Sequence, residues 1–276
     1  MAILLGAFWL RVYRLTGQSF WSDEGATAFM TRRGAADILA ASASDIHPPL
    51  YYLLMAGWAK PAGTSEFALR FPAVVAGVLV VALTIWLGRR CLGPLPAAVG
   101  GALAAISPLL IYYSQEARMY QQLALLGLLA VALAVVLAGV GSKRPAPICL
   151  LAAGKWSPRL LPVWLAGAYV ITVAALLYTQ YVGFLAVLVA TAIVPVRFFR
   201  EGQRWRIWVI WSGLHLLAGL IFLPWAVRVF GQVGGWPAIS EPLELDFYLR
   251  DVFRVFSFGL SWDATVTRTS ELFVAG

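Results

Sequence analysis

Apolar and polar positions occur along this chain in long blocks. Four apolar runs, at residues 67–87, 97–112, 123–140 and 207–230, approach or reach the length of about 20 residues that a helix needs to cross a bilayer. A further run, residues 161–196, is too long for one helix, so it predicts two short helices joined by an outer turn at residues 178–181. The pattern therefore predicts several membrane-spanning helices.

Two shorter apolar pieces, residues 2–10 and 148–153, cannot cross a bilayer alone. We expect the chain to begin inside its first membrane helix or to be truncated at its start. Arg11 and Arg14 follow that piece, and we expect their charged ends to reach the membrane interface while their stems stay in the apolar layer.

A polar loop at residues 16–66 interrupts the apolar pattern early in the chain. Its residues 25–43 are small and mixed, which predicts a helix lying along the membrane surface with Arg32 and Arg33 at the headgroup level. Pro48 and Pro49 start the apolar helix 50–58, because proline is favoured in a first turn. A functional interpretation adds that this rigid bend fixes the polar residues just before it.

Charge gives the helices a direction. Basic residues gather at 88–90, 142–162 and 197–206, which the positive-inside rule places in the cytoplasm, and of the acids only Glu201 falls there. Two crossings separate the 16–66 loop from residues 113–120, so both segments are predicted to open on the same, extracytoplasmic side. Residues 231–276 are polar and predict no further span.

Composition agrees with this topology. Hydrophobic residues make up 61% of the 276 positions and charged residues 12%, about half the usual charged share of a soluble domain. The sequence predicts an all-α polytopic membrane protein, a helical bundle whose extracytoplasmic first loop carries short interfacial helices. We treat residues 1–276 as one membrane domain.

The formal charge of +8 comes from the basic clusters between apolar runs, so it does not predict nucleic-acid binding. Cys91 and Cys149 both fall in predicted cytoplasmic loops, where thiols stay reduced, and we expect no disulfide. The cysteines and the two histidines lack the spacing of a metal site.

Asp23 and Glu24 form the first wall of a candidate site, because carboxylates near a bilayer are costly unless they are paired or solvated. Adjacent side chains point in different directions, so at most one of them is expected to reach a given substrate atom. We predict Asp23 as a general base and Glu24 as an orienting or ion-binding partner. The alternative for Asp23 is a helix N-cap.

A second wall is predicted at residues 113–120 (YSQEARMY), where an amide, an acid and a base share one turn between two helices. Arg118 suits bidentate contact with a phosphate, although a surface ion pair with Glu116 is the alternative. The candidate substrate-binding residues of this wall are Tyr113, Gln115, Glu116, Arg118 and Tyr120. The tyrosines also fit an ordinary interfacial aromatic belt.

Asp45 and His47 complete the candidate substrate-binding residues. A lone histidine is more often a hydrogen-bonded scaffold residue, although imidazole can also contact a phosphate. We predict that no metal is required. A divalent cation bridging Glu24, Asp45 or Glu116 to a phosphate stays open as an alternative.

Four segments, residues 20–24 (FWSDE), 45–52 (DIHPPLYY), 65–72 (SEFALRFP) and 112–120 (YYSQEARMY), resemble in order and spacing the bacterial membrane glycosyltransferases related to protein O-mannosyltransferases and to the aminoarabinose transferase of lipid A. The resemblance covers roughly the first 130 residues. It implies that the chain is truncated at its C-terminus, because the family usually has more spans and a further extracytoplasmic region. It implies an inverting C-class glycosyltransferase in the bacterial inner membrane, with Asp23 as the catalytic acid residue beside Glu24, and with Glu116 and Arg118 lining the same cavity.

Such an enzyme takes a sugar from a polyprenyl-phosphate carrier and passes it to a hydroxyl acceptor on protein, lipid or glycan at the extracytoplasmic face. A carboxylate takes the acceptor proton, and a cation stabilises the departing phosphate. The alternative is a transporter or flippase for a lipid-linked or anionic solute, which predicts ionisable residues near the middle of spans.

Overall fold

The computed structural model describes residues 1–142, 145–153, 161–199 and 205–230, and across these ranges it is built of helices. They are α1 (Ala2–Val12), α2 (Ser22–Met30), α3 (Ala35–Ala43), α4 (Leu50–Ala62), α5 (Glu66–Cys91), α6 (Pro94–Ile106), α7 (Pro108–Ser114), α8 (Tyr120–Leu137), α9 (Pro147–Ala152), α10 (Leu161–Thr179), the 3-10 helix η1 (Tyr181–Gly183), α11 (Phe184–Phe198) and α12 (Trp205–Val229). The predicted polar segment 231–276 lies outside the described residues, as does part of the basic loops.

By length and composition, five helices in the described ranges can cross a membrane: α5, α8, α10, α11 with η1, and α12. A sixth candidate is the pair α6 and α7, which is bent by 56°. The prediction of an all-α polytopic membrane protein is therefore confirmed, as are the two short helices of residues 161–196.

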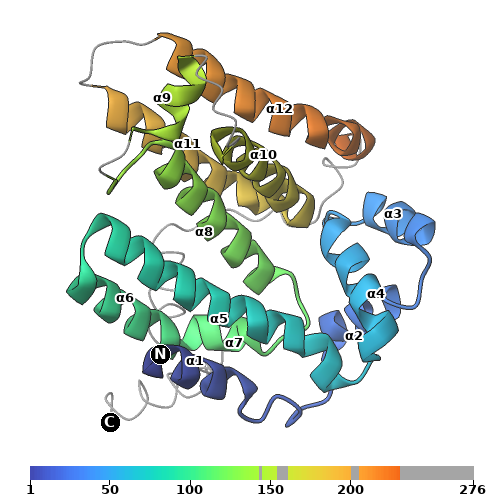
Figure 1. The fold of residues 1–276 in the computed structure, drawn as a ribbon. Coiled ribbons are helices and arrows are strands. Elements are labelled where there is room, and N and C mark those ends of the chain that lie inside the picture. Colours follow the sequence, from blue (N-terminus) through green and yellow to red (C-terminus); the bar gives the residue numbers. More distant parts are fainter. Residues whose placement is uncertain (143–144, 154–160, 200–204, 231–276) are drawn as a thin grey trace, which may run out of the picture.

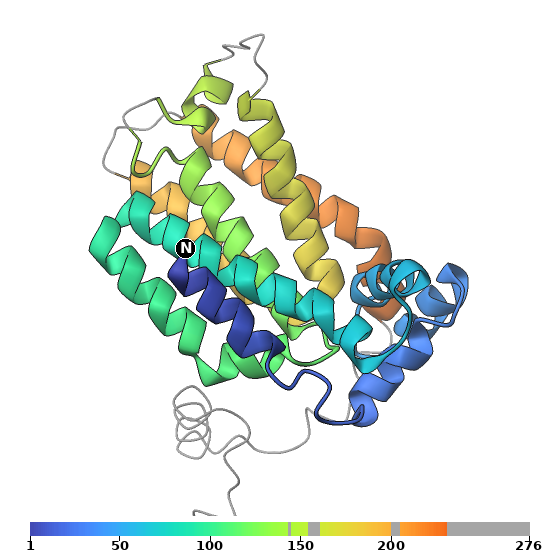
Figure 2. The same cartoon turned by 60° about the horizontal axis from the view of Figure 1, so that its bottom comes forward.

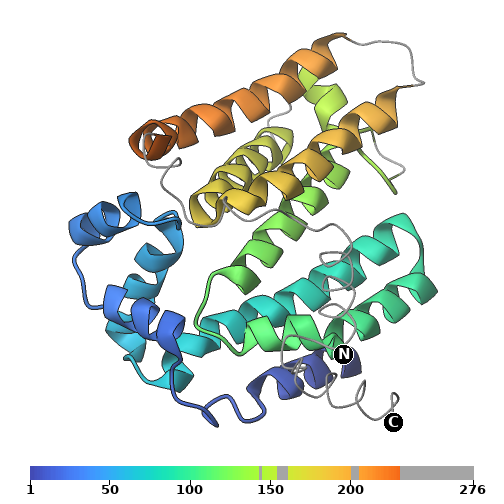
Figure 3. The same cartoon turned by 180° about the vertical axis from the view of Figure 1, so that it is seen from behind.

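The helices form two groups on either side of α8 (Figures 1 and 3). On one side α1 packs along α5 and α6, with α7 beside them (Figure 2). On the other side α10 and α12 pack together, with α9 against both, while α11 packs on α8. The short helices α2, α3 and α4 gather at one end of the molecule (Figure 1).

The turn between α10 and α11 also lies at this end of the molecule. Gln122 Nε2, at the start of α8, donates a hydrogen bond to Thr179 Oγ1 at 3.2 Å. Ala43 at the end of α3 packs against Trp225 and Val229 of α12. Polar segments far apart in the sequence therefore meet at one end of the helical bundle.

A proline in α5 frees a carbonyl that a side chain then satisfies. Pro72 has no N–H, so the carbonyl of Ala68 cannot receive its usual helical bond. Trp58 of α4 donates its indole N–H to that oxygen at 2.8 Å. Because unpaired backbone groups are costly in an apolar environment, this contact holds α4 against the start of α5.

The predicted span 97–112 is not one straight helix. Pro108 cannot donate to the carbonyl of Ala104, and the chain bends there into α6 and α7. Arg11 supplies the missing donors, with Nη2 3.2 Å from the Ala104 oxygen and Nη1 3.0 Å from the Ala105 oxygen. The bend aims α7 at the end of the molecule that carries α2–α4.

Two further predictions need correction. Arg11 does not reach the interface, since it is fully buried and bonded to these carbonyls. Arg14, in contrast, is exposed. The surface helix predicted over residues 25–43 is two helices, α2 and α3, because the chain breaks at Thr31, whose hydroxyl bonds back to the Ala28 carbonyl, and Gly34 starts the second helix in an extended conformation.

Candidate active site

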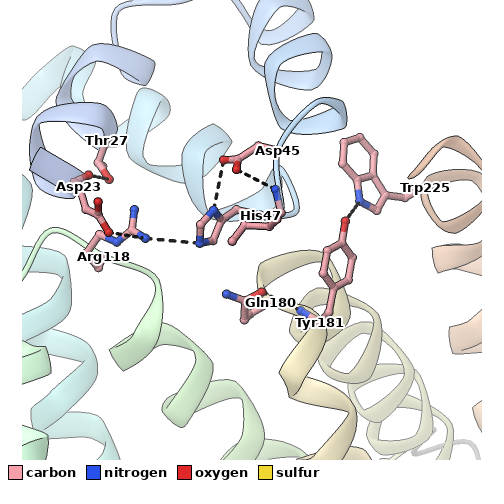
Figure 4. A network of polar contacts seen from close by, with 9 residues as sticks. Asp23, Thr27, Asp45, His47, Arg118, Gln180, Tyr181 and Trp225 are labelled. Carbon is pink, nitrogen blue, oxygen red and sulfur yellow. Dashed lines mark hydrogen bonds and ion pairs between the residues drawn. The ribbon is translucent and has the colours of Figure 1, made fainter. Parts of the chain in front are cut away.

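Asp23 and Arg118 meet directly at the end of the bundle (Figure 4). Asp23 lies in the first turn of α2, and Arg118 lies in the turn that joins α7 to α8. Arg118 Nη2 is 3.2 Å from Asp23 Oδ2. The arginine side chain is 4% exposed and the aspartate side chain 43%, so a buried cation faces a carboxylate that solvent and ligands can still reach. The two predicted walls are thus in contact.

His47 lies on the other side of the same guanidinium (Figure 4). Its Nε2 is 3.4 Å from Arg118 Nη2, and its Nδ1 is 3.2 Å from Asp45 Oδ2. Arginine can only donate, so this network assigns the proton of a neutral His47 to Nδ1, which donates to Asp45. The hydrogen bond from His47 is the largest cause of the lowered pKa of Asp45. Asp45 therefore orients the imidazole, and the imidazole orients Arg118.

Glu24 is held between the two walls rather than facing solvent. Its carboxylate is 1% exposed. It accepts hydrogen bonds from Nε and Nη2 of Arg70 at 2.8 and 2.6 Å, and from the backbone N–H of Ala117 at 2.8 Å. These three bonds join α2, α5 and the α7–α8 turn. Glu24 thus stands where the sequence predicts an orienting residue, with its oxygens already engaged.

Sequence reasoning missed Arg70 as the partner of Glu24. Its Nη1 also donates to the carbonyls of Leu15 and Gln18, at 2.7 and 2.9 Å, so it fixes the connection between α1 and α2. The sequence did contain an indication of this role. A single arginine inside an otherwise apolar predicted span is rare, and such residues usually belong to a functional site.

Gln115 has a structural role at the end of α1. Its Nε2 faces the carbonyl oxygens of Leu10, Arg11 and Tyr13 at 2.9–3.3 Å, which are carbonyls at the C-terminal end of α1. In return, Nε of Arg11 donates to Ser114 Oγ at 3.1 Å. The end of α1 and the start of the α7–α8 turn therefore cap each other.

Close packing surrounds this mutual cap. A Cβ atom added at Gly77 of α5 would lie 2.2 Å from Ser114 Oγ and 2.7 Å from Arg11 Nε. Glycine at this position thus leaves the space in which the arginine reaches the α7–α8 turn.

Glu116 points to a different part of the site from Arg118. It is nearly buried, and burial is the largest cause of its raised pKa. Tyr112 donates a hydrogen bond to it. Glu116 lines a cavity, named here the polar cavity, of about 530 Å³ beside the α1–α2 connection, together with Arg14, Trp21, Glu24, Arg70 and Tyr112 among others.

The tyrosines predicted to bracket the turn lie together. The rings of Tyr113 and Tyr120 have centroids 4.7 Å apart, and the Arg118 guanidinium lies 5.7 Å from the centroid of the Tyr120 ring. Tyr52 of α4, which the sequence did not single out as a ligand-contacting residue, also hydrogen-bonds Arg118. Arg118 is thus held by aromatic rings as well as by the polar groups.

A second cavity, named here the apolar groove, measures about 200 Å³ and runs between α4, α5 and α8. Arg118 is the charged residue in its lining, and most of the other lining residues are apolar, such as Met55, Leu79 and Leu125. Leu79 is 47% exposed on the outer surface of α5. The groove therefore connects the Arg118 guanidinium with the lipid-facing side of a candidate span.

Arg118 Nε, though buried, has no hydrogen-bond partner among the described residues. A buried N–H without a partner is costly, so Arg118 retains one unused hydrogen-bond donor. Among the same residues, no group of three or more His, Cys, Asp or Glu is arranged to hold a metal ion. Independence from metal stays a prediction.

Residues 46–156, less than half of the chain, match the family model described as dolichyl-phosphate-mannose-protein mannosyltransferase. The match includes His47 and the α7–α8 turn with Arg118, whereas Asp23, Glu24 and Asp45 precede it. No curated protein and no solved structure matches the chain significantly.

The apolar helices define a multi-pass membrane protein, and residues 46–156 of it are similar to a family of membrane mannosyltransferases. The predicted resemblance is thereby confirmed at the level of mannosyltransferase-like proteins. The bacterial origin in that prediction stays untested.

Proposed function

We propose that this protein is an inverting glycosyltransferase that moves a sugar from a polyprenyl-phosphate carrier to a hydroxyl acceptor at the extracytoplasmic face of a bacterial inner membrane. The observation that carries the proposal is the Asp23–Arg118 pair at 3.2 Å, with the apolar groove ending at the same guanidinium. The match to a mannosyltransferase family supports the reaction class.

The donor site follows from the chemistry of a lipid phosphate. A polyprenyl chain needs an apolar surface that is open to the bilayer, and its phosphate needs a cation at the inner end of that surface. The apolar groove provides the first, and Arg118, which lines that groove, provides the second. Guanidinium geometry favours bidentate contact with a phosphate.

Phosphate binding also changes the state of Asp23. In the structure Asp23 and Arg118 neutralise each other. A donor phosphate competes for the guanidinium and releases the carboxylate, which is 43% exposed, to accept a proton. Binding of the donor thus prepares the base.

The transfer step balances with these two groups. The acceptor oxygen attacks C1 of the sugar from the side opposite the phosphate, and its proton passes to the Asp23 carboxylate. The bond between C1 and the phosphate oxygen breaks with its electron pair going to the phosphate, where Arg118 stabilises the added charge. His47 and Asp45 keep Arg118 in place.

Sidedness and the absence of a required cofactor belong to the proposal as well. The arginines Arg89, Arg90 and Arg206 stand at the opposite ends of their helices from the site, which agrees with a cytoplasmic location for that end. Catalysis needs no metal in this scheme, because Arg118 supplies the positive charge.

The experiment uses the full chain in proteoliposomes with a panel of radiolabelled sugars on polyprenyl phosphate and a mixture of hydroxyl acceptors. We expect label to move to an acceptor from at least one donor, with release of free polyprenyl phosphate. Label that instead crosses the bilayer unchanged would identify a transporter, and no transfer from any donor would contradict the proposal.

A further inference from the structure

The polar cavity lies apart from the apolar groove on the other side of the α7–α8 turn. Glu116 lines the cavity and Arg118 lines the groove, and neither residue lines both. The cavity volume of about 530 Å³ falls within the range of roughly 300–1,000 Å³ that is typical of ligand sites. Glu24 of its wall is adjacent in sequence to Asp23. The cavity therefore extends to within one residue of the proposed base.

The charges around the cavity balance. Arg14 and Arg70 face Glu24 and Glu116, and the ion pair between Arg70 and Glu24 leaves neither of its members with a free charge. Arg14 and Glu116 remain outside that pair, so a cation entering the cavity is repelled by Arg14 and an anion by the nearly buried Glu116. The lining thus favours a neutral ligand.

Hydrogen-bonding capacity indicates what kind of neutral ligand fits. Glu116 receives a bond from Tyr112, and a carboxylate has about four acceptor positions, so capacity remains for donors from a ligand. Gln18 and Ser19 are exposed and bring an amide and a hydroxyl to the same wall. These groups suit a ligand that carries several hydroxyls.

An aromatic ring completes the lining. Trp21 precedes α2 and is 45% exposed, and its side chain caps no helix N–H. Exposed indole rings offer a flat apolar face together with a polar edge. Such a face packs against the C–H groups of a sugar ring while the hydroxyls turn to the polar wall.

We propose that the polar cavity binds a neutral sugar ring, whose hydroxyls bond Glu116 and whose apolar face packs on Trp21. The source of that sugar rests on the proposed function, since it is either the sugar of the donor or a sugar of a glycan acceptor. The same chemistry serves both, and the experiment separates them.

The test is ligand-observed NMR with the full chain in nanodiscs and methyl α-D-mannopyranoside as the neutral probe. We expect the wild type to bind the probe, and Trp21→Ala and Glu116→Gln each to weaken binding by about tenfold through lost packing or a lost hydrogen bond. The matched control is Phe29→Ala, which removes an exposed aromatic ring from α2, the helix that follows Trp21, away from the cavity and leaves binding unchanged. Gln18→Ala, at an exposed position, provides a third cavity variant that does not disturb packing.

Absence of probe binding in the wild type would overturn the proposal, as would equal binding by the wild type and all three cavity variants. Steady-state transfer then identifies the source, because Trp21→Ala raises KM for the donor if the cavity holds the donor sugar and KM for the acceptor if it holds an acceptor sugar. A chain that binds the probe in this pattern but transfers no sugar would keep the cavity assignment and refute only the proposed function.

Discussion

Asp23 and Arg118 come from segments on either side of two candidate crossings, and yet Arg118 Nη2 lies 3.2 Å from Asp23 Oδ2. Replacing Asp23 would leave the buried Arg118 guanidinium with one partner fewer. The pair is also asymmetric, because the cation is buried while the carboxylate is accessible. This asymmetry is the basis for giving the cation to the leaving phosphate and the carboxylate to the acceptor.

Arg118→Lys tests the phosphate contact. Lysine keeps the positive charge but loses the planar fork and the unpartnered Nε. We expect KM for the donor to rise roughly 10- to 100-fold, the equivalent of about 1.5–3 kcal/mol for a charge-assisted hydrogen bond, with KM for the acceptor nearly unchanged. Steady-state kinetics with each substrate varied in turn measure this, and equal changes in both KM values would contradict the assignment.

Arg11→Met tests the mutual cap between α1 and the α7–α8 turn. The change leaves buried carbonyls of α6 and the Ser114 hydroxyl without their donor, at roughly 1–3 kcal/mol for each unsatisfied group. We expect a lower thermal unfolding midpoint and reduced transfer. Arg32→Met, in the exposed turn after α2, is the matched control and should stay within about 0.5 kcal/mol of the wild type. Equal midpoints for the two variants would show that the cap is dispensable.

The pH dependence of stability tests the burial of Glu116. Its folded-state pKa is raised above the ordinary value of 4.5, so between these two pKa values the folded chain binds more protons than the unfolded chain. This contribution to stability is fully present below pH 4.5 and is lost as pH rises through the folded-state value. Thermal unfolding followed from pH 4 upward should therefore show a decline that Glu116→Gln removes. If the unfolding midpoint of the variant declined with pH as steeply as that of the wild type, Glu116 would be solvated and not buried.

Much of the fold follows from the sequence because membrane spans are set by length and apolarity. The runs at 67–87, 123–140, 161–196 and 207–230 all appear as candidate spans close to their predicted positions. The run at 97–112 differs, because Pro108 removes one backbone donor and Arg11 stabilises the resulting bend. That contact joins residues distant in the chain, which periodicity does not reveal.

The candidate site, like the fold, is predicted by the sequence only in part. The sequence predicts the two polar segments that carry Asp23 and Arg118, because polar turns are conspicuous between apolar runs. It does not predict which cation Glu24 would bond. Arg70 takes that place through a helix packing that no local pattern encodes, although its charge within an apolar run marked it as unusual. The roles assigned to all these residues stay predictions.

The central claim is that the Asp23 carboxylate takes the acceptor proton during sugar transfer. The most direct measurement compares wild type with Asp23→Asn in proteoliposomes, using the labelled polyprenyl-phosphate sugar that the wild type accepts, with Asp37→Asn as an exposed control carboxylate on α3. We predict that Asp23→Asn lowers kcat by at least about 100-fold, the lower end of the usual contribution of a general base, while donor binding persists and the control transfers normally. Normal turnover by Asp23→Asn would contradict the account.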